Sequence, residues 1–188
     1  MKLKLLVGLL LLSVAGFAQE RRWTANVGGG FTPLLGNVNN YLPNGWNLEG
    51  GAGYNFGPVL SATADFTYNG LGVSQRVLNG AGLTGGGAHL WSLTVNPRLS
   101  LKYVGAMRPY VAAGVGYYRL DIHGNQSTSN GIDAVFGDRG GIGGSLGLGM
   151  DFAIGDTGLK AFTDVRYHYA STGKLPVRMI PVQIGVRW

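Results

Sequence analysis

Apolar residues alternate with polar or small residues through most of the chain after residue 22. The last ten residues show the pattern clearly, with one face formed by Ile180, Val182, Ile184, Val186 and Trp188 and the other by Met179, Pro181, Gln183, Gly185 and Arg187. Successive side chains of a β-strand point to opposite faces, so a period of two predicts a strand with one apolar face. The chain is therefore expected to be built from strands.

Eight segments with this alternation are the predicted strands, at residues 23–32, 45–56, 59–69, 90–103, 109–122, 142–154, 159–169 and 179–188. A β-strand crosses a bilayer with about 9–11 residues, whereas a helix needs roughly 18 or more apolar residues. No stretch after residue 18 is apolar over that length. Because hydrocarbon tolerates no unpaired backbone amides, strands that cross it must close into a barrel. The expected fold is all-β, a transmembrane up-and-down antiparallel β-barrel of eight strands.

Short and long connections alternate between these segments. The short ones span residues 57–58, 104–108 and 155–158, and the long ones span 33–44, 70–89, 123–141 and 170–178. In outer-membrane barrels the short turns face the periplasm and the long loops face outward. Both termini are therefore expected in the periplasm.

The faces of the fifth segment, residues 109–122, can be assigned in two ways. Arg119 and Asp121 are not expected to face lipid, so they are assigned to the inner face. This assignment turns Tyr110 and Tyr118 outward. Amphipathic aromatic rings favour the membrane interface, so two girdles of outward aromatics are expected. The girdle residues are Trp23, Tyr103 and Tyr110 toward the periplasm and Trp46, Tyr68, Trp91 and Tyr169 toward the outside.

The amino-terminal residues are predicted to form a secretory signal peptide. Lys2 and Lys4 precede a leucine-rich stretch, and Gly16 and Ala18 are the small residues that a signal peptidase requires. Residues 1–18 are the expected signal peptide and residues 19–188 the outer-membrane β-barrel domain. The chain has no cysteine, which excludes a lipoprotein signal, disulfides and thiolate metal sites.

Composition agrees with a membrane barrel. Charged residues make up 13% of the chain, against about a quarter in soluble globular domains. The net charge falls from +6 to +4 without Lys2 and Lys4. This mild excess favours anionic lipid headgroups as partners over nucleic acid.

Charged residues also lie on the inward faces, where an ion-pair network is expected. An eight-stranded barrel is just wide enough for side chains to fill it, and buried charges persist when they are paired. Asp65 and Arg98 are the best predicted pair, and Asp164 and Arg166 extend it. A narrow polar pore stays open as the alternative, because inward glycines leave some room. The predicted network contains Glu49, Asp65, Arg98, Lys102, Arg119, Asp151, Asp164 and Arg166.

No catalytic, cofactor-binding or metal-binding residues are predicted, and the protein is not expected to be an enzyme. The segment around His168 and Ser171 is faintly similar to the His-x-Ser-Asn motif of lipid A deacylases. Aligning Ser171 with the motif serine puts Tyr169 at the histidine position, and His168 faces the opposite side of the strand. The glycine runs lack a following helix and a Lys-Ser/Thr pair, and the three histidines lack ligand spacing. Lipid A modification stays only a remote alternative.

The mature chain resembles small outer-membrane β-barrel proteins of the OmpA-like, OmpX and opacity-protein type. The segments that carry the likeness are residues 108–116 and the closing strand, residues 180–188, which ends on an aromatic residue. The resemblance implies a monomer in the bacterial outer membrane, without the peptidoglycan-binding domain of the OmpA family. It also implies that the barrel-assembly machinery recognises the last strand through Ile184, Val186 and Trp188.

The resemblance further implies outer-membrane lipids and lipopolysaccharide as partners, with periplasmic chaperones during biogenesis. A structural, envelope-integrity or surface-adhesion role through four extracellular loops is the expected function. A narrow porin-like diffusion channel is the main alternative.

Overall fold

The structure is a computed structural model that describes residues 22–36, 42–80, 86–124, 139–155, 157–172 and 176–188. The strands are β1 (Trp23–Thr32), β2 (Gly45–Asn55), β3 (Leu60–Gly72), β4 (Gly86–Ser100), β5 (Met107–Gly124), β6 (Arg139–Ala153), β7 (Lys160–Ala170), β8 (Val177–Met179) and β9 (Val182–Arg187). A short helix, α2 (Gln75–Gly80), lies between β3 and β4. Within the described ranges, no helix is long and apolar enough to span a membrane. The expected signal peptide, residues 1–18, lies outside these ranges.

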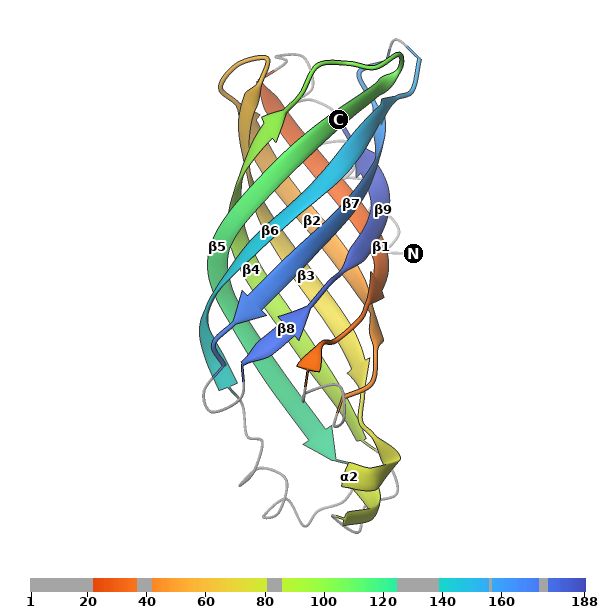
Figure 1. Ribbon diagram of the computed structural model, residues 1–188, viewed down its shortest axis with the longest axis vertical. Helices are drawn as coiled ribbons and strands as arrows, with labels where there is room; N and C mark the ends of the chain where they lie inside the picture. The colour runs from red at the N-terminus through yellow and green to blue at the C-terminus, as the bar shows by residue number, and fades with distance from the viewer. Residues whose placement is uncertain (1–21, 37–41, 81–85, 125–138, 156, 173–175) are drawn as a thin grey trace, which may run out of the picture.

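The strands form one antiparallel sheet that closes on itself (Figure 1). Neighbours in sequence pair from β1 to β7, and β9 joins β7 to β1. Both β8 and β9 pair with β7, so they are two parts of one strand that is interrupted at Ile180 and Pro181. Proline has no N–H to donate to a ladder, but the Pro181 carbonyl still accepts a hydrogen bond from the Arg166 amide at 3.2 Å. The predicted eight-stranded barrel is confirmed.

The barrel has two distinct ends. The connections from β2 to β3, β4 to β5 and β6 to β7 are short turns at the top of Figure 1, here called the short-turn end. The opposite end, where β1, β3, β5 and β7 finish and α2 lies, is called the long-loop end. Glycines with positive φ, Gly105 and Gly155, allow the tight reversals after β4 and β6.

Alternation along each strand separates an outer apolar face from an inner face that is mostly polar. On β2, Leu48 is exposed on the outside whereas Asn47 and Glu49 are buried inside. Ile184 on β9 is 68% exposed, and large apolar side chains cover the outside of the other strands in the same way. A bilayer around the barrel would cover this surface.

The predicted register of β5 is wrong. Tyr110 and Tyr118 are 1% and 0% exposed inside the barrel, whereas Val111, Val115 and Tyr117 are on the outside. Arg119 faces outward and pairs with Asp121 at 2.8 Å. The physical reason is depth: Arg119 lies beside Trp91 in the sheet, at the level of the aromatic girdle. A charge near the interface costs about 0–1 kcal/mol, far less than one at the bilayer midplane.

Outward aromatic residues gather near both ends of the strands. At the short-turn end, the rings of Trp23 and Tyr54 lie 5.2 Å apart and Tyr103 is exposed. At the long-loop end, Trp46 lies 5.6 Å from Tyr68. Trp91 there lies 5.7 Å from Tyr117, and Tyr169 is outward on β7. Tyr110 was expected in the first girdle, but the register of β5 turns it inward.

We expect Val115→Arg to destabilise the barrel in a bilayer by about 2–4 kcal/mol, because this outward residue lies in the middle of β5. Val104→Arg is the matched control. Val104 is equally exposed but lies in the turn beyond Tyr103, so its loss should be about 0–1 kcal/mol. Urea unfolding of both variants from lipid vesicles measures the difference. Equal losses would contradict the placement of β5 in the membrane.

Candidate functional site: the barrel interior

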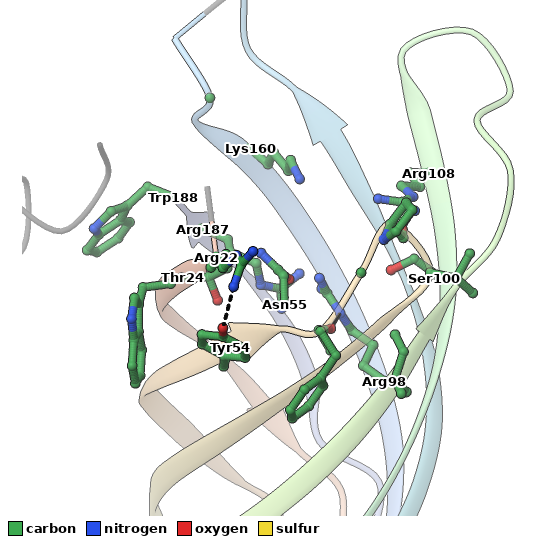
Figure 2. Close-up of a pocket in the computed structure, with 18 of the residues that line it drawn as sticks. Arg22, Thr24, Tyr54, Asn55, Arg98, Ser100, Arg108, Lys160, Arg187 and Trp188 are labelled. Atoms are coloured by element: carbon green, nitrogen blue, oxygen red, sulfur yellow. Dashed lines mark hydrogen bonds between the residues drawn. The ribbon is translucent and has the colours of Figure 1, made fainter. Parts of the chain in front are cut away.

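The short-turn end opens into a cavity of about 760 Å³, here called the mouth cavity (Figure 2). It is lined by residues from the inward faces of several strands and from the rim of the barrel. Five of its lining residues are cations: Arg22, Arg98, Arg108, Lys160 and Arg187. The mouth cavity is therefore strongly basic.

Beneath the mouth cavity, Arg98 and Arg187 share the carboxylate of Asp151. Arg98 Nη1 lies 3.2 Å from Asp151 Oδ2, and Arg187 Nη1 pairs with Oδ1 of the same group. All three side chains are nearly completely buried. The guanidinium groups also lie over the inward aromatic rings, with Arg98 4.7 Å from the Tyr110 centroid and Arg187 4.6 Å from that of Phe162. Cation–π contacts of this kind stabilise charges that have lost water.

The middle of the interior is an ionic centre formed by Asp65, Asp164 and Arg166. Arg166 Nη2 donates to Asp164 Oδ2 at 3.0 Å, and Arg166 Nη1 lies 3.6 Å from Asp65 Oδ2. The Tyr110 hydroxyl donates to Asp164 at 2.7 Å, and Asn96 Nδ2 donates to Asp65 at 2.8 Å. All five side chains lie within this hydrogen-bonded cluster, which joins β3, β4, β5 and β7.

Glu49 lies beside this centre and is held by neutral donors. Asn26 Nδ2 donates to Glu49 Oε1 at 3.2 Å, and the Thr67 hydroxyl donates to Oε2 at 3.3 Å. A buried carboxylate that accepts several hydrogen bonds loses less of its solvation energy on burial. Glu49 therefore contributes to the polar interior through hydrogen bonds from β1 and β3.

The predicted pair of Asp65 with Arg98 is wrong. In the sheet Arg98 lies opposite Ser61, four residues before Asp65 on β3. Four residues of strand span about 13 Å, which separates the two groups. Arg98 Nε instead donates to the Ser61 hydroxyl at 3.2 Å, and its charge is matched by Asp151 across the barrel.

Two further members of the predicted network lie elsewhere. Lys102 is exposed after the end of β4, and Arg119 is on the outer face.

His168 is inside the barrel, and its Nδ1 hydrogen-bonds with the Tyr118 hydroxyl at 2.8 Å. Ser171 is exposed just after β7. Among the described residues, no group of three or more His, Asp or Glu side chains is placed to hold a metal ion.

Next toward the long-loop end is a row of amide and hydroxyl groups. Gln183 donates to Asn47 at 3.0 Å, Asn47 donates to Thr32 at 2.9 Å, and the Thr32 hydroxyl donates to Asn69 at 2.7 Å. Asn69 then donates to the backbone carbonyl of Leu90 at 3.0 Å. The row links β9, β2, β1, β3 and β4 through buried neutral groups.

Beyond this row the interior becomes apolar, contrary to the polar inner face expected from the alternation. The residues of this apolar plug are Leu34, Leu42, Leu71, Ala88, Leu90, Tyr118, Leu120, Ala170, Val177 and Met179. They are at most 7% exposed. A signal was present, since the inward face of β3 changes from Asn69 to Leu71 and that of β4 from Ser92 to Leu90. The expected strand at residues 59–69 stops before Leu71, and the expected register of residues 109–122 turned Tyr118 and Leu120 outward.

The residues expected to guide assembly lie on the closing strand. Ile184 faces outward on β9, and the backbones of Ala25 and Trp188 exchange hydrogen bonds of 2.9 and 3.0 Å. Trp188 is half-buried and lines the mouth cavity. The terminal residue therefore contributes to the seam where the barrel closes.

We expect Arg166→Met to destabilise the barrel by about 3–5 kcal/mol, because it leaves the buried carboxylates of Asp65 and Asp164 without their cation. Arg119→Met is the matched control. It removes an arginine from a partly exposed pair with Asp121, so the expected loss is about 0–1 kcal/mol. Urea unfolding of the refolded variants gives both values. Similar losses for the two variants would contradict the role of the ionic centre.

The closed barrel agrees with comparisons to known proteins. The chain is similar to neisserial surface protein A (TM-score 0.65, 16% identity, 88% of this chain and 95% of that chain). It is similar to a major outer membrane protein from Thermus thermophilus (TM-score 0.60, 9% identity, 89% and 98% covered). It is also similar to the N-terminal β-barrel domain of Pseudomonas aeruginosa OprF (TM-score 0.52, 12% identity, 88% and 97% covered).

These likenesses show the fold alone, and no curated protein matches the chain. The family comparison goes further, because the model described as "Outer membrane protein beta-barrel domain" matches residues 5–187. The chain therefore belongs to the outer membrane protein β-barrel domain family and is a protein of the outer membrane.

Proposed function

We propose that this protein is a sealed structural barrel that holds its long loops at the cell surface, for envelope integrity or adhesion. The observation that carries the proposal is the filled interior. From the mouth cavity inward, ion pairs, an amide row and the apolar plug follow one another along the barrel. The side chains of these layers fill the lumen, so it is not a water-filled channel.

The apolar plug is the strongest support. Leu90 and Tyr118 are 0% exposed and lie inside the barrel with Leu71 and Met179 at the long-loop end. An ion that crossed this layer would lose its hydration without gaining polar partners, which is how hydrophobic constrictions block conduction. The plug therefore supports a closed barrel over a narrow channel.

Inward glycines were the main argument for a pore, and their surroundings favour a packed interior. A Cβ added at Gly114 would overlap the Asn96 side chain, and one at Gly147 would overlap Arg166. A Cβ at Gly149 would overlap the Tyr110 ring. The space beside these glycines is occupied by the side chains of the polar network.

In the orientation we propose, the short-turn end and both termini face the periplasm, as is usual for such barrels. The long-loop end then faces the outside, with the apolar plug beneath the loops. Lipopolysaccharide and outer-membrane lipids are the proposed partners around the barrel. The proposed assembly signal is the outer face of β9 with Trp188, which the barrel-assembly machinery would bind.

We also propose that the protein is not an enzyme. His168 is inside the barrel and bonded to Tyr118, whereas Ser171 is exposed after β7. The two groups of the faint deacylase-like segment thus have different surroundings. A serine nucleophile needs its base within hydrogen-bond reach.

Single-channel recording of the refolded barrel in a planar bilayer tests the sealed state. We expect no steady openings from the wild-type protein, Asp65→Ala or Arg98→Ala, because the apolar plug remains in all three. Heat-dependent gel mobility confirms that each sample is folded, and a general porin in the same bilayer is the positive control. Steady openings whose conductance changes with Asp65→Ala would show that the lumen conducts.

A further inference from the structure

The mouth cavity has an excess of positive charge. Its described lining contains five cations and no aspartate or glutamate side chain, and Asp151 beneath it is shared by Arg98 and Arg187. Arg108 is occupied by the carbonyls of Leu101 and Pro58. Asp151 neutralises only one of these positive charges. The remaining positive charge would attract an anion that enters from outside the barrel.

Arg187 lines the mouth cavity and carries a buried donor that has no partner among the described residues. The residue is 3% exposed, and its Nε has no hydrogen-bond partner among the described residues, although its Nη1 pairs with Asp151. Leaving a buried charged donor unsatisfied costs free energy that an incoming acceptor would recover. Arg22 and Lys160 line the same cavity as Arg187, and Figure 2 labels all three around it.

The shape of the mouth cavity points to a lipid as the source of the anion. Its lining includes inward residues, such as Thr24 and Ser61, and outward rim residues. Trp23, Phe56 and Tyr103 belong to this rim and are 53–63% exposed on the lipid-facing side. The cavity thus connects the lumen with the surface that acyl chains would cover. Its size also lies within the roughly 300–1,000 Å³ of small-molecule sites.

We propose that the mouth cavity binds the headgroup of an anionic glycerophospholipid from the adjacent leaflet. Arg22, Lys160 and Arg187 would hold the phosphate, and the acyl chains would lie outside against the aromatic rim. Arginine and lysine are the usual phosphate ligands, and arginine can donate two hydrogen bonds to one phosphate. This binding site goes beyond the proposed structural role and does not depend on whether the lumen conducts.

Native mass spectrometry of the folded barrel in a maltoside detergent tests the proposal. We expect the wild-type protein to retain one phosphatidylglycerol molecule and far less phosphatidylcholine. Arg22→Gln combined with Lys160→Gln should lower phosphatidylglycerol retention about tenfold or more, because it removes two cations that would donate charge-assisted hydrogen bonds to the phosphate inside the cavity. Both residues are at the rim of the barrel, outside the buried ionic centre. If the double variant does not fold, the two single variants are tested in its place.

Lys102→Gln is the matched control. Lys102 is an exposed cation at the same end of the barrel but does not line the mouth cavity. It should leave retention unchanged. An equal loss with Lys102→Gln, or no loss with the double variant, would overturn the site.

Phosphorus NMR titration with inorganic phosphate in the same detergent distinguishes the source of the anion. We expect much weaker binding than that of phosphatidylglycerol, because free phosphate lacks the contacts with the aromatic rim. Binding of inorganic phosphate that is as tight as that of the lipid would overturn the assignment to a lipid headgroup.

Discussion

The pairing of every backbone amide that lies in hydrocarbon is the constraint on which this structure depends. An open strand edge in the bilayer would leave N–H and C=O groups unpaired, at several kcal/mol each. The pairing of β9 with both β1 and β7 removes that edge. The interruption at Pro181 is tolerated because its carbonyl still bonds to Arg166 of β7 and β8 continues the strand beyond it.

Closure with eight strands also determines what the interior can contain. A barrel of this size is only wide enough for side chains, so charged residues on inward faces lose most of their water and need partners. Arg166 lies between Asp65 and Asp164, and Arg98 and Arg187 meet at Asp151. The polar layers and the apolar plug thus both follow from closure. The mouth cavity is where the excess of cations meets the solvent and the lipid.

Much of the fold could be predicted from the sequence, because the alternation of faces is a local property of each strand. The eight strands and their order followed from it. The partners inside the barrel did not, since they depend on the stagger between strands. Arg98 lies opposite Ser61 and not near Asp65. No local pattern in β3 or β4 predicts this offset between the two strands.

Two other differences have separate causes. The register of β5 was assigned from the cost of exposing Arg119 to lipid, but that cost depends on depth, and Arg119 lies at the interface level beside Trp91. The apolar plug was missed for two reasons: the expected strand at residues 59–69 stops before Leu71, and the wrong register of β5 turned Tyr118 and Leu120 outward. Strand boundaries are the least predictable part of a sequence pattern.

Osmotic shrinkage of vesicles densely reconstituted with the barrel, followed by stopped-flow light scattering, tests the filled interior most directly. Water is the smallest permeant, so it reports gaps too narrow for ions. The packed lumen predicts water permeability equal to that of protein-free vesicles. A permeability clearly above that level, in proportion to the amount of folded protein, would show a continuous water path and contradict the sealed barrel.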